Sequence, residues 1–525
     1  MLPVVADALL LRPHGRSTES RIFAMEQLGL SYIAAAARSC GLSVRIVDGC
    51  LTPEVYDHLL ETVRPSDYLV IGFPVYPESL SRVAQDASGL RTRGVQGHIT
   101  VGNHLATLRA PELLSAFPVF DSAIRGEGER TFRELVNCIN VGKSLSGVLG
   151  LTYRDGIAIR SNPPRPNISD LDVLPFPARD TLPIVLERGN VPLLYTSRGC
   201  NARCEFCSVH KFFSASPYGS WRGRSPKNVV DEIEELLAKF SVEEFAFADE
   251  QFMGHGPPGR VRALGIAEEI LRRHLNVRWY IETRASSVDY EAFAVLRDAG
   301  LKVVFMGLES GYNPALKQLR KGATVARYFE AIEILQQLQI LPSGGFIMFR
   351  PETTLEELRF NLDFLDAVGC VEVSALTTEL RVYPGTDLES RLIIGGKLSG
   401  RWEELRFEYL DPRVAECREI AFASAGTFAA AYNEFARFRR RGLVSYTESL
   451  KLQRLMNSGP IKVMRRVVDR VEAEGEASST LKSEAQQGFR DACEDFWRVL
   501  LLVEGIAERR TVGGGVKLLS PMYLC

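Results

Sequence analysis

The sequence has no long apolar run. No stretch approaches the roughly 18 residues that a membrane-spanning helix needs. The first residues, MLPVVADALLLRPHG, also lack the basic flank and cleavage site of a secretory signal. A surplus of charge is missing too, because 63 basic and 65 acidic residues leave a net charge of −2, which gives no signal for a polyanionic partner. We therefore expect a cytoplasmic protein that contacts neither membrane nor nucleic acid.

Cysteine is sparse and unevenly placed. Ten cysteines in 525 residues are too few for a disulfide-stabilised scaffold, which favours reduced thiols. Three of them, Cys200, Cys204 and Cys207, stand together in RGCNARCEFCS with the spacing C-x3-C-x2-C, and the next cysteine is Cys370. Metal sites built from cysteine usually have four ligands. The motif therefore predicts a metal cluster with one position that the nearby cysteines leave open.

The composition is that of a globular protein, with 46% hydrophobic and 24% charged residues, and the length predicts two to four domains. Residues 1–141 alternate apolar runs with amphipathic stretches in five βα units, which predicts a parallel, doubly wound (Rossmann-like) α/β sheet covered on both faces. Ligands of such sheets bind at the carboxyl ends of the strands, where this sequence concentrates Gly, Pro and Asn. The expected strands are 4–11, 42–49, 67–76, 98–103 and 120–129, and the expected helices are 26–41, 53–63, 79–94 and 111–117.

Three further regions follow. Residues 142–190 are irregular and rich in proline, which predicts an extended linker. A second βα series over residues 191–390 has too few repeats for a closed eight-stranded barrel, so we expect an open, partial (β/α)6 barrel. Residues 391–525 have a helical pattern without strands and would form a substrate-related domain. The strands expected in the second series are 191–199, 243–252, 277–285, 302–311, 344–351 and 371–385.

Two kinds of metal site fit the three cysteines. A structural zinc site would need a fourth ligand, and His210 lies three residues after Cys207. The alternative is a [4Fe–4S] cluster with three protein thiolates, which leaves one iron free to bind a substrate or cofactor. The position of the motif favours the cluster, because it follows the first strand of the barrel series, at the face where such folds build active sites.

With this spacing and position, the motif resembles the hallmark of the radical S-adenosylmethionine (radical SAM) superfamily, and Phe206, just before the third cysteine, matches as well. The resemblance implies that Cys200, Cys204 and Cys207 hold a [4Fe–4S] cluster whose open iron chelates the amino and carboxylate groups of SAM. An electron from the cluster, which is itself reduced by a donor such as flavodoxin or ferredoxin, then generates a 5′-deoxyadenosyl radical.

Other segments resemble the parts of that superfamily that contact SAM. VVFMGLESG matches the fourth strand, YIETRASS matches the third, and FAFADEQF ends the second strand at the same rim. For each carboxylate and arginine the alternative is a solvated rim residue. The loop after the fifth strand departs from the family, because FRPETT lacks the family's glycines and carries Arg350, which would reshape the substrate side. The cofactor-binding residues implied here are Phe206, Asp249, Glu250, Arg284, Gly307, Glu309, Ser310 and Gly311.

A doubly wound domain before such a barrel resembles the cobalamin-binding subclass, and RGEGERTF after the fifth strand matches a G-E-G-E segment of that subclass. Glycines at strand ends let the backbone approach a broad corrin, and N–H groups at a helix N-terminus suit phosphate or amide oxygens. VGNH has Asn where relatives often have a second glycine, and Asn tolerates the positive φ of such a turn. The implied cobalamin contacts are Gly72, Pro74, Tyr76, Ser79, Gly102, Asn103, His104, Thr107, Gly126, Glu127 and Gly128.

His14 does not match the pattern of a cobalt ligand. Its loop reads RPHGRS instead of the D-x-H-x-x-G of base-off cobalamin proteins, so the loop supplies no carboxylate to orient the imidazole. We expect the lower face of the corrin to be unligated or covered by a side chain. Two alternatives for the domain remain. One is a Rossmann-like module that binds nothing or dimerises, and the other is a methylthiotransferase-type auxiliary cluster, which would have to use Cys40, Cys50 and Cys138.

The resemblance implies a division of labour between the cofactors. The deoxyadenosyl radical abstracts a hydrogen from an unreactive carbon, methylcobalamin delivers a methyl group to the carbon radical, and a second SAM remethylates cob(I)alamin. Our first hypothesis is therefore C-methylation of a small-molecule intermediate, as in natural product biosynthesis. The alternatives are a non-methylating rearrangement, ring contraction, cyclisation or oxidation, and a scaffold or carrier without turnover.

Overall fold

The computed structural model describes residues 5–14, 25–214, 221–401, 405–424, 427–428, 430–432, 434–435 and 444–511. The chain divides into two compact units. Unit 1 comprises Met1–Asn201, Phe206–Val277 and Val382–Arg406, and unit 2 comprises Ala202–Glu205, Arg278–Arg381 and Phe407–Cys525. Within the described ranges, no helix is both long enough and apolar enough to span a bilayer.

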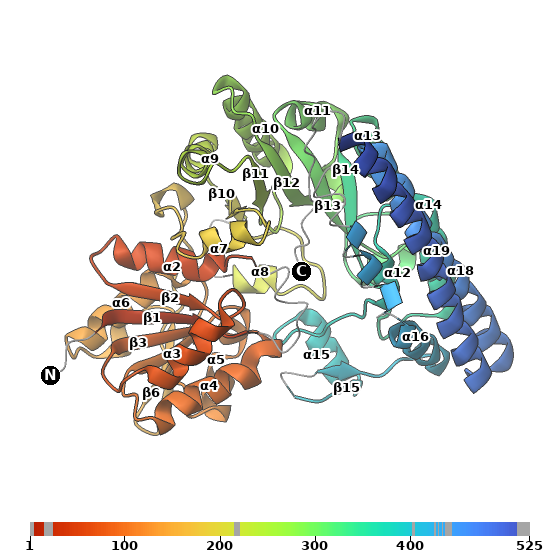
Figure 1. Ribbon diagram of the computed structural model, residues 1–525. Helices are drawn as coiled ribbons and strands as arrows, with labels where there is room; N and C mark the ends of the chain where they lie inside the picture. Colours follow the sequence, from red (N-terminus) through yellow and green to blue (C-terminus); the bar gives the residue numbers. More distant parts are fainter. Residues whose placement is uncertain are drawn as a thin grey trace. The chain divides into compact units, whose positions relative to one another are not determined.

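Unit 1 opens with a seven-stranded sheet in the order β2-β1-β3-β4-β5-β6-β7 (Figure 1). The first five strands are parallel, as the sequence predicts, and successive strands are joined by helices. The strands are β1 (Ala6–Arg12), β2 (Val44–Asp48), β3 (Tyr68–Pro74), β4 (His98–Gly102) and β5 (Ser122–Ile124), and the helices are α2 (Leu28–Arg38), α3 (Pro53–Thr62), α4 (Leu80–Thr92), α5 (His104–Ala116) and α6 (Gly128–Asn140).

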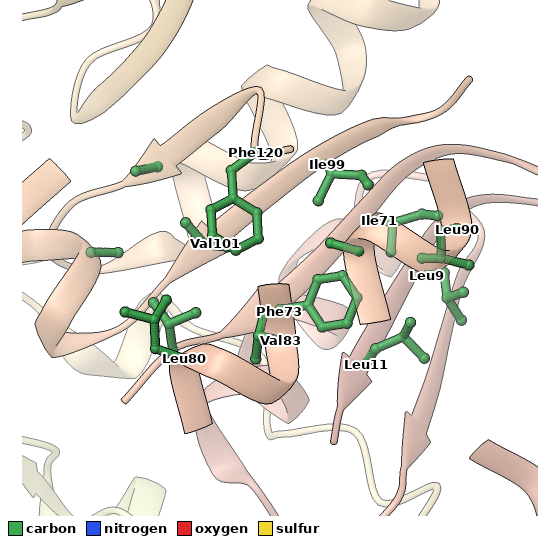
Figure 2. Close-up of a cluster of buried hydrophobic side chains, with 14 of the residues drawn as sticks. Leu9, Leu11, Ile71, Phe73, Leu80, Val83, Leu90, Ile99, Val101 and Phe120 are labelled. Atoms are coloured by element: carbon green, nitrogen blue, oxygen red, sulfur yellow. The ribbon is translucent and has the colours of Figure 1, made fainter. Parts of the chain in front are cut away.

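Alternate side chains of β1 point into two separate cores. Leu9 and Leu11 pack with residues of β3, β4 and helices α3, α4 and α5, in the cluster drawn in Figure 2. Ala8 and Leu10 pack on the opposite face with residues of α2 and α6. Both faces of the sheet are therefore buried, which explains why its strands are continuous apolar runs.

The region expected to be a linker contributes two strands to this sheet. β6 (Leu151–Asp155) pairs antiparallel with β5, and β7 (Ala158–Ser161) pairs antiparallel with β6. The turn between them contains Gly156 at a φ of 61°, a conformation that suits a two-residue hairpin loop. The expectation of a linker from residue 142 is therefore wrong for this hairpin, although residues after Ser161 do run on without strands as far as β8 (Leu193–Leu194).

Helix α5 begins seven residues before the predicted start at residue 111. Asn103 caps it with a φ of 84°, and its side-chain oxygen accepts a hydrogen bond from the backbone N–H of His104 at 2.7 Å. The helix is interrupted at Arg109, two residues before Pro111, because proline removes a backbone donor and displaces the preceding turn. The prediction that Asn103 adopts positive φ is confirmed.

The second βα series is divided between the two units. In unit 1, β8 pairs parallel with β11 (Glu244–Phe247), and β9 (Ser197–Arg198) pairs antiparallel with β10 (Arg222–Gly223). In unit 2, β12 (Arg278–Thr283), β13 (Leu301–Glu309) and β14 (Leu341–Phe346) are parallel neighbours. The helices of this series are α7 (Leu182–Glu187), α8 (Val209–Phe212), α9 (Pro226–Phe240), α10 (Gly256–Arg272), α11 (Tyr290–Asp298), α12 (Asn313–Gln318), α13 (Val325–Gln337) and α14 (Leu355–Val368).

The sixth strand expected in this series, residues 371–385, is absent from the described chain. A 3-10 helix, Val373–Thr377, occupies its first half, and only an isolated parallel bridge joins Phe349 to Glu379.

The remainder is mainly helical, with α15 (Asp387–Ile394) in unit 1 and α16 (Pro412–Ser424), α18 (Tyr446–Glu474) and α19 (Ser479–Thr511) in unit 2. The expectation of no strands beyond residue 390 is corrected by β15 (Leu398–Ser399) and β16 (Arg406–Phe407). Several residues of this region, namely 402–404, 425–426, 429, 433, 436–443 and 512–525, lie outside the described residues.

Candidate functional site

Unit 1 contains a cavity of about 240 Å³ at the carboxyl ends of β1, β3, β4 and β5. Its floor is apolar, and glycines at the strand ends bring backbone to its surface. A Cβ on Gly72 would lie 2.9 Å from Leu10 Cδ2 and 3.4 Å from a ring carbon of Phe132, so an added side chain would displace Leu10. Nine of the eleven residues predicted to contact cobalamin line the cavity, namely Gly72, Pro74, Tyr76, Gly102, Asn103, His104, Gly126, Glu127 and Gly128.

The other two predicted residues support the lining loops. Thr107 donates to the carbonyl of Asn103 at 2.8 Å and accepts from the backbone N–H of Gly126 at 3.0 Å. Ser79 accepts from the backbone N–H of Tyr76 at 3.1 Å. Both hydroxyls therefore hold wall residues in place and do not line the cavity.

Residues near the cysteine motif complete the cavity. They come from the segments around β8, α8 and the end of β11, which follow the last strand of the sheet by more than 30 residues in the sequence. Sequence patterns gave no signal for most of them, because an aromatic in a helical stretch is usually core. These lining residues are Tyr195, Arg198, Phe212, Phe213 and Glu250.

Glu127 has a different role from the predicted cofactor contact. Its carboxylate accepts hydrogen bonds from Arg198 at 2.8 Å, from Arg222 at 3.0 Å and from the backbone N–H of Ile168 at 2.7 Å. Burial opposes the charge on Glu127, but the two guanidinium groups outweigh burial and lower its pKa. Arg198 also donates to Glu129 at 2.6 Å. The G-E-G-E segment therefore lines the cavity, and its carboxylates bind arginines in the cavity wall.

Asp249 and Glu250, predicted together, are placed differently. Asp249 is fully buried, and its carboxylate accepts from the Thr196 backbone at 2.6 Å, from the Thr196 hydroxyl and from the Ser197 hydroxyl at 2.8 Å. These bonds make Asp249 a structural carboxylate. Glu250 reaches the cavity, where it accepts from the backbone N–H of Gly199 at 2.9 Å. Burial raises the pKa of Glu250 to about 7.

His14 lies away from the cavity. Its Nε2 is 3.1 Å from Asp57 Oδ1, and its ring meets that of Tyr56 edge-on. His14 is not among the residues that line the cavity in the described chain. The expectation that this histidine does not ligate cobalt therefore stays a prediction that the geometry supports.

Unit 2 gathers a second group of predicted residues around Cys204. Arg284 Nη1 lies 3.7 Å from the Cys204 sulfur, and Arg284 also donates to the backbone carbonyl of Lys321. The ammonium of Lys321 is 2.8 Å from Glu309 Oε1. Burial lowers the pKa of Lys321, but the charges of Glu309 and Cys204 outweigh burial, and the net shift is upward. Sequence reasoning missed Lys321, which no pattern in the sequence marks.

The remaining predicted residues of unit 2 are packed tightly. Ser310 Oγ and the backbone N–H of Gly311 both donate to Asn361 Oδ1, at 2.9 and 2.7 Å. A Cβ on Gly307 would lie 2.4 Å from Glu309 Oε1, so Gly307 makes room for that carboxylate. A role of these residues in binding SAM stays a prediction.

Arg350 forms an ion pair inside unit 2. Its guanidinium is buried and forms two hydrogen bonds with Glu357, at 3.0 and 2.7 Å, and a third with Gln318 at 2.6 Å. These partners fix the Arg350 side chain, and its effect on the substrate side stays a prediction.

The three motif cysteines form no disulfide in the described chain, which suits a thiolate cluster site. Cys200 and Cys207 belong to unit 1 and Cys204 to unit 2. Among the described residues, no three His, Cys, Asp or Glu side chains form a ready-made metal site, and this includes the auxiliary set Cys40, Cys50 and Cys138. Of that set, Cys50 donates to the carbonyl of Pro13, and Cys138 lies within α6.

Both groups of residues fit the cofactors that the sequence implies. The cavity offers an apolar floor, backbone at its glycine rim and one buried, unpaired oxygen, Glu129 Oε2, which can accept a hydrogen bond from an amide. Around Cys204, the guanidinium of Arg284 offers N–H donors to a sulfur ligand or a carboxylate.

Comparisons with known proteins match the chain to two families. The B12 binding domain model matches residues 20–136, and the radical SAM superfamily model matches residues 194–365. An uncharacterized methyltransferase of Pyrococcus horikoshii is 27% identical over 390 residues, which cover 73% of this chain and 82% of the relative. An anaerobic magnesium-protoporphyrin IX monomethyl ester cyclase of Rubrivivax gelatinosus is 31% identical over 272 residues, and the match spans 49% of this chain and about half (47%) of the cyclase.

One solved structure resembles nearly the whole chain. The cobalamin-dependent S-adenosylmethionine radical enzyme OxsB, with aqua-cobalamin and SAM bound, superposes with a TM-score of 0.72 at 17% identity. The match covers 97% of this chain and 82% of OxsB. At this identity the likeness shows a shared fold.

Proposed function

Because the chain is a cobalamin-dependent radical SAM enzyme, we propose that it methylates an unactivated carbon of a small-molecule biosynthetic intermediate. Its cofactors are a [4Fe–4S] cluster, SAM and cobalamin. When bound, the cluster and SAM supply a 5′-deoxyadenosyl radical that abstracts hydrogen, and the corrinoid supplies the methyl group. An electron donor such as flavodoxin or ferredoxin is part of the proposal.

The observation that carries the proposal is the composite wall of the cavity. One part of the wall consists of strand-end residues of the B12-binding domain. The other part consists of Arg198 and Phe212, which flank the cysteine motif, and Glu250, which follows β11. A corrinoid held there would lie against the chain segments on either side of the cluster ligands. Such proximity is what transfer of a methyl group to a carbon radical requires.

The protein side of this chemistry is positioning and exclusion of water. Gly72, Gly102 and Gly126 would let the backbone approach the corrinoid, while Phe212 and Phe213 would cover it. In unit 2, Arg284 would bind the carboxylate of SAM, and the Lys321–Glu309 pair would fix the end of β13 beneath it. The similarity to a protein named as a methyltransferase supports the same reaction.

A substrate-independent label transfer tests the proposal. Anaerobic enzyme loaded with hydroxocobalamin is reduced and incubated with SAM that carries a trideuterated methyl group, and the corrinoid and nucleosides are then analysed by mass spectrometry. We expect the deuterated methyl group in the extracted corrinoid, together with S-adenosylhomocysteine. Formation of 5′-deoxyadenosine alone, with an unlabelled corrinoid, would count against methylation.

The second candidate is a non-methylating reaction, such as a radical rearrangement, ring contraction, cyclisation or oxidation. The similarity to a protein named as a cyclase supports it. The same experiment separates the two, because a non-methylating enzyme consumes SAM without leaving its methyl group on the corrinoid.

A further inference from the structure

The ring of His104 has a fixed direction. Its backbone N–H is bound by the side chain of Asn103, and the positive φ of Asn103 turns the chain sharply from β4 into α5. Thr107, one helical turn later, binds the carbonyl of Asn103. The backbone therefore sets where the imidazole points, and the ring forms part of the cavity wall.

The other side of that ring contacts the segment that follows the cysteines. His104 Nδ1 lies 2.8 Å from the hydroxyl of Ser208, the residue directly after Cys207. The imidazole also stacks on Phe212 with the ring centres 4.4 Å apart and an angle of 19° between the planes. Phe212 lines the same cavity. One side chain thus contacts both the corrinoid cavity and the backbone neighbour of a predicted cluster ligand.

Nδ1 of His104 either donates a hydrogen bond to the Ser208 hydroxyl or accepts one from it. Burial lowers the pKa of His104 to about 4, which favours the neutral ring. The pair is therefore in the same protonation state throughout the physiological range. Since His104 and Phe212 are half-buried rings in contact, a ligand that fills the cavity presses on both of them.

We infer that His104 is a positioning residue that couples corrinoid binding to SAM binding, through its contacts with Ser208 and Phe212. Filling the cavity fixes the His104–Phe212 pair, which fixes Ser208 and with it the adjacent Cys207. By linkage, cobalamin and SAM then change each other's affinity by the same factor. This coupling is a property of the bound state, so it holds whether or not the enzyme methylates its substrate.

Two variants remove the hydrogen bond from opposite ends. Ser208→Ala deletes the hydroxyl and leaves every cavity-lining side chain unchanged. His104→Phe keeps a ring against Phe212 but has no nitrogen. Ser208→Thr retains a hydroxyl and serves as the conservative control. The double variant His104→Phe/Ser208→Ala completes a thermodynamic cycle.

The measurement is the dissociation constant of SAM, determined by anaerobic equilibrium dialysis on protein with an oxidised cluster, with and without hydroxocobalamin. Iron content and cobalamin affinity are measured on the same preparations. We expect cobalamin to tighten SAM binding by about five-fold or more in the wild-type protein and in Ser208→Thr. The factor by which cobalamin tightens SAM binding should fall close to one in Ser208→Ala, in His104→Phe and in the double variant, with iron content retained.

Two results would overturn the inference. One is a wild-type protein whose SAM affinity does not respond to cobalamin. The other is a Ser208→Ala protein, loaded with iron and cobalamin, in which cobalamin tightens SAM binding as much as it does in the wild-type protein. If His104→Phe fails to bind cobalamin, the Ser208→Ala variant alone tests the inference, because Ser208 is not among the residues that line the cavity. Loss of label transfer with intact coupling would instead contradict only the proposed methylation.

Discussion

Arg198, two residues before Cys200, donates a hydrogen bond of 2.8 Å to Glu127 in the wall of the cavity. A second bond of 2.6 Å joins its guanidinium to Glu129, and the cation lies 4.9 Å above the ring of Tyr32. The segment that enters the cysteine motif is therefore bound to a loop that lines the cavity. The carboxylates of the G-E-G-E segment make this connection.

Replacing Arg198 by methionine should leave two buried carboxylates without their shared cation. A buried charge that loses its partner typically costs about 3–5 kcal/mol, so we expect a large loss of stability and poor retention of both cofactors. Arg198→Lys keeps the charge but lacks the branched guanidinium group that binds both carboxylates. Its stability and cofactor content should lie between those of the wild type and Arg198→Met. Urea unfolding would measure the loss of stability, and iron and corrinoid analysis would measure the retention of the cofactors.

The matched control for Arg198 is Arg160→Met. Arg160 pairs with Asp155 in an exposed hairpin, where solvent weakens the ion pair and its contribution to stability is small. Equal stability and equal cofactor content in Arg198→Met and Arg160→Met would contradict the role given to Arg198.

Lys321→Met should be more harmful than the double variant Lys321→Met/Glu309→Gln. The single change strands the Glu309 carboxylate in a buried site, at a cost of about 3–5 kcal/mol, whereas the double change leaves a neutral amide. Unfolding free energies of the two singles and the double form the test. Losses that simply add would argue that the two side chains act independently.

Gly72→Ala should weaken corrinoid binding by ten-fold or more, as a rough expectation, because the added methyl would lie 2.9 Å from Leu10 and displace the cavity wall. Titration of apoprotein with hydroxocobalamin, followed by absorbance, measures the affinity. Gly89→Ala is the control, since it lies on helix α4 with no atom within 4 Å of the new Cβ. Unchanged affinity in Gly72→Ala would show that this wall does not contact the corrinoid.

Glu250→Gln should change how stability depends on pH. In the folded chain Glu250 has a pKa of about 7, above the ordinary value of 4.5. The protonated carboxyl group therefore makes its full contribution to the free energy of unfolding below about pH 4.5. That contribution falls as the pH rises to 7 and is constant beyond. The variant lacks this dependence, so its stability relative to the wild type should rise across that window by up to about 3 kcal/mol.

Denaturant unfolding at pH 5 and pH 8 provides the comparison for Glu250. Glu61→Gln, an exposed carboxylate on helix α3, serves as the reference and should show no such change. A stability difference between Glu250→Gln and wild type that is the same at both pH values would contradict the raised pKa.

Sequence patterns predicted the five parallel strands well, because a sheet buried on both faces produces uninterrupted apolar runs. They failed where a local signal was weak or overridden. The β6–β7 hairpin was hidden by the prolines that follow it, although the Asp155–Gly156 pair marks its turn. The start of α5 was placed at Pro111, when a capping Asn103 begins the helix earlier.

The cavity was located by its glycines, but the roles of its charged residues depended on tertiary contacts. Nothing near Glu127 in the sequence indicates that its carboxylate binds arginines 71 and 95 positions away. Phe212 and Lys321 have no distinguishing pattern at all. Residue type and spacing therefore indicate which loops meet at a site, whereas hydrogen-bond partners decide which side chains face the ligand.

The most direct test is Mössbauer spectroscopy of anaerobic protein reconstituted with ⁵⁷Fe and cobalamin, recorded with and without SAM. The account predicts a [4Fe–4S] cluster and an equimolar corrinoid in one chain, with one iron whose spectrum changes when SAM binds. It also predicts that Cys204→Ala loses this cluster but still binds the corrinoid. The account would be contradicted by a cluster with four equivalent irons whose spectrum does not change when SAM is added, or by a protein without iron.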